Sequence, residues 1–277
     1  MNPEHVFVLM LENRSFDHLF AYSKIHGKDA ISGIHTKIIT AKDTDFNSFK
    51  GKDYFINSNA NFALGKKEKD PGHEFDDMLV QLCGKEAILG PNGEYPIVNN
   101  SGFIDAYFKK QKSNPEKIME CFDPDKLPIL NQLANEFVIC DKWFCSVPGP
   151  TYVNRLFLHA STSAGSYSLN GGIIPKLLNA FGFRFKNGSI FSKLDDVNIP
   201  WTIYHDKGIP MVWMLNDIDS DDTKELEKFY TDIKNPDYQP KFTFIEPSYK
   251  PIKQFRGNSM HPKGDVRDGE LLIKNIF

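Results

Sequence analysis

The chain has 277 residues, and its 33 basic and 36 acidic side chains leave a formal net charge of only −3. Hydrophobic residues make up 40 % of the chain, which is ordinary for a globular protein that buries a sizeable core. The balanced charge gives no support for a nucleic acid partner or for an anionic membrane surface. At roughly 150 residues per domain the length fits one large or two ordinary domains, and we expect a single domain over residues 1–277.

The beginning of the chain shows neither a membrane span nor a secretion signal. The longest apolar run near the N-terminus, Val6 to Leu11, has six residues, whereas a transmembrane helix needs roughly 20. The opening MNPEHV lacks a basic region and a long apolar region. As written, the chain is therefore expected to be cytoplasmic and without a transmembrane segment. A secreted or periplasmic location would require that the N-terminus is incomplete.

The first pattern is an apolar strand that runs into polar residues and then into a helix. Val6–Leu11 is continuously apolar and too short for an amphipathic helix, so it predicts a strand buried on both faces. Phe16 and Phe20 then recur at helical spacing, with Ser15 or Asn13 available as N-cap. A strand, a polar corner and a helix form the opening of an α/β unit.

The rest of the chain alternates between strand and helix patterns, with loops expected at 22–72 and 168–175. In chain order, the patterns predict helices at 73–83 and 126–135, a strand at 137–144, a helix at 152–161, a strand at 199–205, a helix at 221–234 with a capping box at Asp222 and Glu225, a strand at 241–247 and a last helical pattern within 260–277. This alternation favours an α/β fold in which a mostly parallel central sheet is flanked by helices.

Two oxygen-bearing side chains follow the first strand directly. Open α/β sheets bind ligands beyond the carboxyl ends of their strands. Glu12 and Asn13 lie at such an end, and a carboxylate beside an amide suits a divalent cation. The alternative is structural, with Glu12 paired to Arg14 or Lys142 and Asn13 capping the helix. Residue types alone leave both interpretations open.

A threonine opens the helix that follows the P-G-P turn. Thr151 can be an ordinary N-cap, but a hydroxyl at a helix N-terminus can also act as a nucleophile on an anionic phosphate. Asn154 and Arg155, one turn further on, can contact phosphate oxygens, although Arg155 can equally form an ion pair. The pattern alone does not separate these roles.

Three histidines lie at turns or strand ends. His73 in DPGHEF and His261 in MHPKGD can protonate a leaving oxygen or hold a phosphate oxygen. His205, at the end of a predicted strand, is a weaker candidate of the same kind. Each of them taken alone is more often structural than functional.

The motifs of several other enzyme classes are absent from the sequence. It contains no G-x-G-x-x-G after a strand, no G-x-x-x-x-G-K-[ST], no G-x-S-x-G and no H-E-x-x-H. Dinucleotide or P-loop nucleotide binding, serine hydrolysis and zincin chemistry therefore lose their usual support.

Four blocks in this order resemble the bacterial phosphoesterase family. They are VFVLMLENRSFDHLF, DPGHEF, CDKWFCSVPGPTYVNRLF and HPKGDVRDGELLIKNIF. That family contains non-zinc-type phospholipases C and acid phosphatases and is part of the alkaline phosphatase superfamily. The resemblance runs from residue 5 to residue 277, and the first and third blocks together are highly specific.

The resemblance implies roles for individual residues. It assigns Glu12 and Asn13 to a divalent metal ion of unknown identity and Thr151 to the nucleophile, whose oxygen also reaches the metal. It assigns His73 and His261 to phosphate binding or to protonation of the leaving group. The family fold, a mostly parallel sheet flanked by helices, agrees with the fold expected from the strand and helix patterns.

The sequence departs from the family pattern after its last helix. Family members continue into a strand with an acidic pair that completes the metal site, so we expect an alkaline-phosphatase-like domain that lacks its C-terminal part. The expected function is hydrolysis of phosphoric esters of the phospholipase C type, with a phospholipid headgroup as a candidate substrate. Two alternatives stay open: an acid phosphatase acting on monoesters, and a truncated, non-catalytic remnant that binds phosphate.

Overall fold

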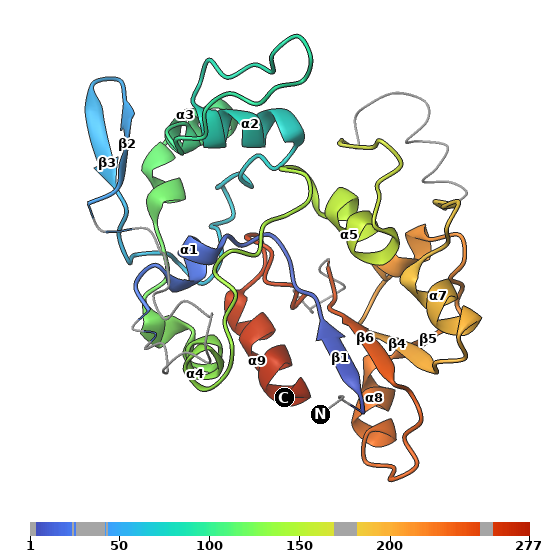
Figure 1. Ribbon diagram of the computed structural model, residues 1–277. Helices are drawn as coiled ribbons and strands as arrows, with labels where there is room; N and C mark the ends of the chain where they lie inside the picture. The colour runs from blue at the N-terminus through green and yellow to red at the C-terminus, as the bar shows by residue number, and fades with distance from the viewer. Residues whose placement is uncertain (1–3, 24, 26–41, 43, 169–181, 250–256) are drawn as a thin grey trace, which may run out of the picture. The chain divides into compact units, whose positions relative to one another are not determined.

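The computed structural model describes residues 4–23, 25, 42, 44–168, 182–249 and 257–277 (Figure 1). Its chain divides into two compact units. The sheet unit consists of Met1–Glu12 together with Pro150–Phe277, and the inserted unit consists of Asn13–Gly149. Each unit contains some of the candidate residues.

The sheet unit is built on four parallel strands. They are β1 (Val6–Leu9), β4 (Trp201–His205), β5 (Thr223–Glu225) and β6 (Phe242–Glu246), in the spatial order β1-β6-β4-β5. Every neighbouring pair is parallel. The expected α/β class with a parallel central sheet is therefore confirmed.

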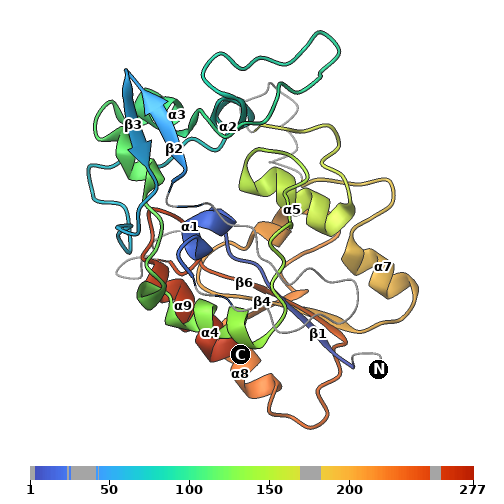
Figure 2. The ribbon, with the colours of Figure 1, turned by 60° about the vertical axis from the view of Figure 1, so that its left-hand side comes forward.

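Helices cover both faces of this sheet (Figure 2). They are α5 (Thr151–Ala160), α7 (Ile190–Asp196), α8 (Leu226–Asp232) and α9 (Val266–Ile276), with a short 3₁₀ helix η3 at Met211–Met214. Tyr204 and Ile245, opposite each other in the register, pack with α8 and α9. The preceding residue on β6, Phe244, points to the other face, where it meets His159 of α5 and Phe191 of α7.

The inserted unit is mainly helical and carries one antiparallel hairpin. Its elements are α1 (Phe16–Phe20), β2 (Phe46–Phe49), β3 (Lys52–Phe55), α2 (Phe75–Cys83), α3 (Phe103–Gln111), the 3₁₀ helices η1 (Pro115–Met119) and η2 (Pro124–Lys126), and α4 (Pro128–Glu136). In the described part of the chain, no helix combines the length and hydropathy that crossing a bilayer would require.

Most elements with a clear hydrophobic period form where the sequence predicts them. The structure confirms the predicted elements that correspond to β1, α1, α2, α4, α5, β4, β6 and α9. Sequence patterns missed α3, α7 and the β2–β3 hairpin, which lies within the expected loop 22–72. Residues 169–175 of the turn expected at 168–175 lie outside the described residues.

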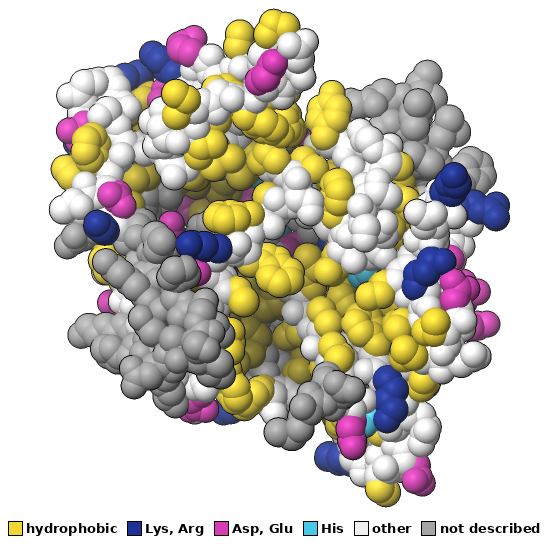
Figure 3. Space-filling model, in the orientation of Figure 1, with side chains coloured by type: hydrophobic (Ala, Val, Ile, Leu, Met, Phe, Trp, Pro, Cys, Tyr) yellow, Lys and Arg dark blue, Asp and Glu magenta, His cyan; other side chains and the backbone are white. Residues whose placement is uncertain are grey.

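The strand predicted at 137–144 is wrong. This segment contains no helix or strand, and Val138, Trp143 and Phe144 are 80–82 % exposed. Several hydrophobic side chains are likewise exposed on the face shown in Figure 3. An apolar run forms a strand only where another strand offers hydrogen bonds, and none of the described strands pairs with this one.

Two smaller predictions also need correction. β1 is not buried on both faces, since Val6 and Phe7 are each 41 % exposed. The strand has only β6 as a neighbour among the described strands, so one of its edges has no strand beside it. The helix predicted from Asp222 begins later because Thr223–Glu225 pair with β4 as β5, and the Asp222 carboxylate instead accepts from the Asp219 amide.

His159 makes the stability of the sheet unit dependent on pH. Its ring is 2 % exposed, lies 4.8 Å from the Phe244 ring, and its Nε2 has no hydrogen-bond partner among the described residues. Burial, together with the nearby Arg155 charge, lowers the pKa of His159 from 6.5 to about 3. Below pH 6.5 the unfolded chain therefore binds a proton at this histidine, whereas the folded chain does not. As a result, the free energy of unfolding decreases as the pH is lowered between these two values.

We expect His159 alone to reduce the free energy of unfolding by about 2 kcal/mol when the pH is lowered from 7 to 5. Replacing it in His159→Phe should remove this part of the pH dependence, as measured by urea unfolding at both pH values. His5→Gln, at a partly buried histidine of the same unit, serves as the control. Equal pH dependence in the His159→Phe variant and the parent would contradict the assignment.

Candidate functional site

Ionisable side chains lie at, or shortly after, the ends of three neighbouring strands. β6 ends on Glu246, β4 ends on His205, and the chain that leaves β1 reaches Glu12 two residues after Met10. Because the strands are parallel and adjacent, their carboxyl ends share one edge of the sheet. This edge is where open α/β sheets bind ligands.

A buried ion pair joins helix α5 to this edge. Arg155 and Glu246 are both 0 % exposed, and Arg155 Nη1 lies 3.3 Å from Glu246 Oε1. Arg155 Nη2 also donates to the Met10 carbonyl oxygen at 3.1 Å, and the guanidinium lies 4.9 Å from the centre of the Tyr249 ring. One side chain of α5 thus contacts the ends of both β1 and β6.

The carboxylate of this pair is held from a second side. The Met211 amide donates to Glu246 Oε2 at 2.6 Å. Burial raises the pKa of the Glu246 carboxyl group, while the Arg155 charge and the amides of Met211 and Val212 act in the opposite direction. A carboxylate in this position stays ionised only with these donors around it.

Thr151 is the first residue of α5, one turn before Arg155. The helix begins after Pro150, whose extended backbone (φ −70°, ψ 158°) forms the N-cap without a side-chain hydrogen bond. Asn154 Nδ2 donates back to the Pro150 carbonyl oxygen at 3.3 Å. Residues four apart share a face of a helix, so the ion pair of Arg155 fixes the side of α5 on which Thr151 lies. Amides at this helix end favour an anion.

Ser259 connects Glu12 with the turn that contains His261. The Glu12 amide donates to the Ser259 carbonyl oxygen at 2.9 Å, and the His261 amide donates to Ser259 Oγ at 3.4 Å. The Lys263 amide donates to His261 Nδ1 at 3.2 Å, which leaves Nε2 as the other nitrogen of the ring. Within the sheet unit, no described residue forms a hydrogen bond or ion pair with the Glu12 carboxylate.

The Glu12 charge acts on the same cluster as the ion pair. Burial raises the pKa of the Tyr249 hydroxyl group well above its usual value, and the charges of Glu246 and Glu12 raise it further. His205, at the end of β4, has its Nδ1 2.8 Å from the Asp206 carbonyl oxygen, and its ring lies 5.8 Å from that of Trp213. The sheet unit therefore groups Glu12, Thr151, Asn154, Arg155, His205 and His261 around the carboxyl edge of the sheet or the start of α5.

The inserted unit begins with the remaining residue of the polar corner. Asn13 adopts a left-handed backbone (φ 57°), a conformation that asparagine tolerates better than most residues. Ser15, and not Asn13, caps α1 by accepting from the His18 amide at 3.1 Å. This excludes the capping role that the sequence left open for Asn13.

Arg14 is buried in the inserted unit beside aromatic rings. Its guanidinium lies 5.3 Å from the centre of the Phe122 ring, against which His18 is stacked. Burial lowers the pKa of Arg14 to about 10, and the negative charge of Asp70 acts against that shift. Arg14 therefore remains a cation at neutral pH and attracts Asp70.

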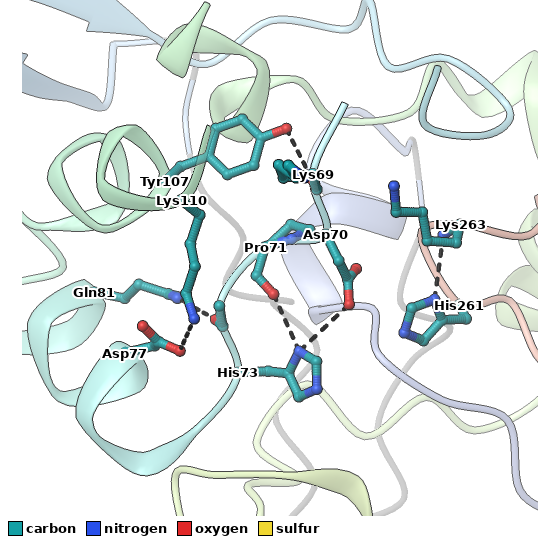
Figure 4. Close-up of polar contacts among 11 residues, drawn as sticks. Lys69, Asp70, Pro71, His73, Asp77, Gln81, Tyr107, Lys110, His261 and Lys263 are labelled. Atoms are coloured by element: carbon teal, nitrogen blue, oxygen red, sulfur yellow. Dashed lines mark hydrogen bonds and ion pairs between the residues drawn. The ribbon is translucent and has the colours of Figure 1, made fainter. Parts of the chain in front are cut away.

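Asp70 also contacts His73, in the turn shown in Figure 4. His73 Nδ1 lies 3.6 Å from Asp70 Oδ2 and 3.1 Å from the Pro71 carbonyl oxygen. Helix α2 holds the same turn through Gln81, whose Nε2 donates to the Gly72 carbonyl oxygen at 2.6 Å. A Cβ at Gly72 would come within 2.4–2.8 Å of the Asp77 side chain, so the close packing of this turn needs glycine.

The candidate residues therefore form two groups, one in each unit. Asn13 and His73 lie in the inserted unit, and the other six lie in the sheet unit. That the two groups form a single site remains a prediction. Sequence reasoning did not include Glu246 or Asp70. Glu246 shares one signal with Glu12, a carboxylate directly after an apolar strand.

The donor atoms fit a hard cation in type but not in number. Glu12, Asn13 and Thr151 offer a carboxylate, an amide and a hydroxyl oxygen. Over the described ranges, no three histidine, cysteine, aspartate or glutamate side chains are grouped as a metal site would group them. These residues on their own do not make a tight metal site.

Comparison with known proteins identifies the family. The phosphoesterase family model matches residues 3–277. The chain belongs to the phosphoesterase family. Non-specific phospholipase C3 of Arabidopsis thaliana is 29 % identical over 282 residues, which cover 98 % of this chain and 50 % of that protein. Non-specific phospholipase C6 of the same plant is 31 % identical, over 98 % of this chain and 48 % of that protein.

A bacterial relative is more distant. Phospholipase C B of Mycobacterium tuberculosis is 27 % identical over 225 residues, covering 74 % of this chain and 38 % of that protein. The chain thus spans about half the length, or less, of the curated phosphoesterases it matches. The resemblance read from the sequence motifs is confirmed at the level of the family.

Breaking the buried pair should strongly destabilise the sheet unit. We expect Glu246→Gln or Arg155→Met to lower the free energy of unfolding by about 3–5 kcal/mol, because each leaves its partner buried without a counter-charge. The double variant should lose less than the sum of the two single variants. Urea unfolding measures all three.

An exposed ion pair of the same unit provides the control. Lys193 and Asp196 lie 2.8 Å apart with side chains 59 % and 62 % exposed, so Lys193→Met should change stability by at most about 1 kcal/mol. Losses of equal size at Lys193 and at Arg155 would show that the buried pair has no special importance.

Proposed function

We propose that this phosphoesterase chain carries the nucleophile of a phospholipase-C-type hydrolase that cleaves phosphodiesters of lipid headgroups. The observation that carries the proposal is the position of Thr151 as the first residue of α5. A buried arginine one turn later fixes that helix to the carboxyl edge of the sheet. The printed names of the relatives support phospholipids as the substrate class.

In the proposed reaction, Thr151 Oγ forms a bond to phosphorus while the bond from phosphorus to the leaving alcohol oxygen breaks. The hydroxyl proton leaves to water, and His261 or His73 gives the leaving oxygen its proton. Water then attacks the phosphothreonine and releases the phosphoryl product. Amides at the start of α5 and the amide of Asn154 can hold the phosphoryl oxygens.

The sequence left two roles open for Arg155, contact with phosphate and an ion pair. Its guanidinium faces Glu246 and the Met10 carbonyl oxygen, so we assign it to holding α5 in place. Direct contact between Arg155 and phosphate remains a prediction, as does a contact from His205.

A divalent cation remains part of the proposal, with Glu12 and Asn13 as two of its ligands. Such an ion would lower the pKa of a hydroxyl group and polarise the phosphoryl group. Because the described residues offer too few donors for tight binding, no step above depends on the ion.

Substitution of Thr151 tests the nucleophile. We expect hydrolysis of p-nitrophenyl phosphorylcholine to fall at least about 100-fold in Thr151→Ala and to persist in Thr151→Ser, because serine keeps a hydroxyl group at this position. Release of p-nitrophenol is followed with and without added divalent metals, beside p-nitrophenyl phosphate as a monoester.

The possible outcomes separate the functions. Turnover of the diester that needs the hydroxyl supports the proposal, whereas preference for the monoester would replace it with a phosphatase. A folded chain that shows no more turnover than Thr151→Ala with any metal would overturn catalysis by this chain and leave phosphate binding as its role.

A further inference from the structure

A small cavity lies in the sheet unit, apart from the start of α5. It has a volume of about 220 Å³ and is bordered by helices α8 and α9 and by the loops that follow β4 and β6. Pockets for drug-sized ligands have roughly 300–1,000 Å³. The space therefore suits a compact group of a few heavy atoms.

Negative charge predominates in the wall of this cavity. Asp206, Glu227 and Asp268 line it against a single cation, Lys207. The three carboxylates come from different segments: the loop after β4, the first turn of α8 and the first turn of α9. Asn258 Nδ2 donates to Asp206 Oδ2 at 2.7 Å and so orients one of them. The excess of carboxylates favours a cationic ligand.

The remaining wall combines leucine side chains and Tyr230 with the polar Asn258 and Asn275. Leu226 and Leu272 are each 4 % exposed and belong to the hydrophobic cluster between the sheet and the two helices. Tyr230, one turn after Leu226, also lines this space. Burial raises the pKa of the Tyr230 hydroxyl group, and the charges of Asp206 and Glu227 raise it further, so both charges act on this side chain.

Carboxylates beside an apolar wall favour an organic ammonium group over a metal ion. A metal ion requires several oxygen ligands converging at about 2–2.6 Å, and no group of three acidic, histidine or cysteine side chains in the described residues is arranged to hold one. An alkylated ammonium group spreads its charge over methyl or methylene groups and binds apolar walls and aromatic faces beside carboxylates.

We propose that the cavity between α8 and α9 binds a small organic ammonium group, such as that of choline or ethanolamine. The ligand would rest against Leu226, Leu272 and the Tyr230 ring, with Glu227 and Asp268 supplying the counter-charge. Free amines and lipid headgroups present the same group. Only the lipid source rests on the proposed function; binding of the ammonium group itself does not.

Binding is measured by NMR titration of the full chain carrying Thr151→Ala, so that no turnover interferes. The ligands are choline, tetramethylammonium and 3,3-dimethylbutan-1-ol, a neutral molecule with the shape of choline. We expect saturable shifts for both cations and at least tenfold weaker binding of the neutral alcohol. Glu227→Gln and Tyr230→Leu should each weaken choline binding several-fold, whereas Asp237→Asn, at an exposed carboxylate of the same unit, should not.

Further titrations test whether the ammonium group comes from a lipid headgroup and whether calcium competes for the cavity. Phosphocholine and lysophosphatidylcholine micelles, added in place of choline, show whether the ammonium group is accepted as part of a headgroup or only as a free amine. Equal binding of the neutral alcohol, absence of any choline shift at tens of millimolar, or displacement of choline by calcium at equal concentration would each overturn the proposal. Because the nucleophile is removed, these results are independent of whether Thr151 is catalytic.

Discussion

The buried ion pair between Arg155 and Glu246 is the constraint on which the geometry of the sheet unit depends. Both side chains are fully buried, and Arg155 also binds the Met10 carbonyl oxygen, so a single guanidinium connects α5 with β1 and β6. Buried pairs contribute little net stability, because the removal of two charges from water offsets their attraction. What this pair provides is a unique position, since a displaced α5 would leave two opposite charges buried apart.

The inserted unit uses the same physical device near its own candidate residues. The Arg14 guanidinium is desolvated against Phe122, yet with a pKa of about 10 it stays charged and attracts Asp70. Asp70 in turn lies 3.6 Å from His73 Nδ1. In each unit an arginine from one of the family motifs, Arg14 or Arg155, is thus buried. Asn13, next to Arg14, adopts a left-handed backbone, and Thr151, one turn before Arg155, begins α5 after the proline corner.

The sequence predicts local features well and pairings poorly. A continuous apolar run identified β1, and helical spacing identified α1 and α5, because these signals depend on neighbours along the chain. Residues 137–144 carry the same apolar signal but have no strand partner in the described structure. Glu246 escaped the list of candidates because its importance comes from Arg155, 91 positions away. Which strand pairs with which, and which charge meets which, are tertiary facts that composition and spacing do not contain.

The exposed segment before the P-G-P turn raises the question of what holds the proposed nucleophile in place. The strand expected there would have supported Thr151 from the N-terminal side. Instead, the support comes from the C-terminal side of the residue: Val153 and Leu156 are 0 % exposed, and Arg155 between them is tied to two strand ends. Apolar burial of α5 holds the helix against the sheet, whereas the ion pair sets the rotation of the helix about its axis and its position along that axis. A nucleophile held in this way needs no ordered strand before it.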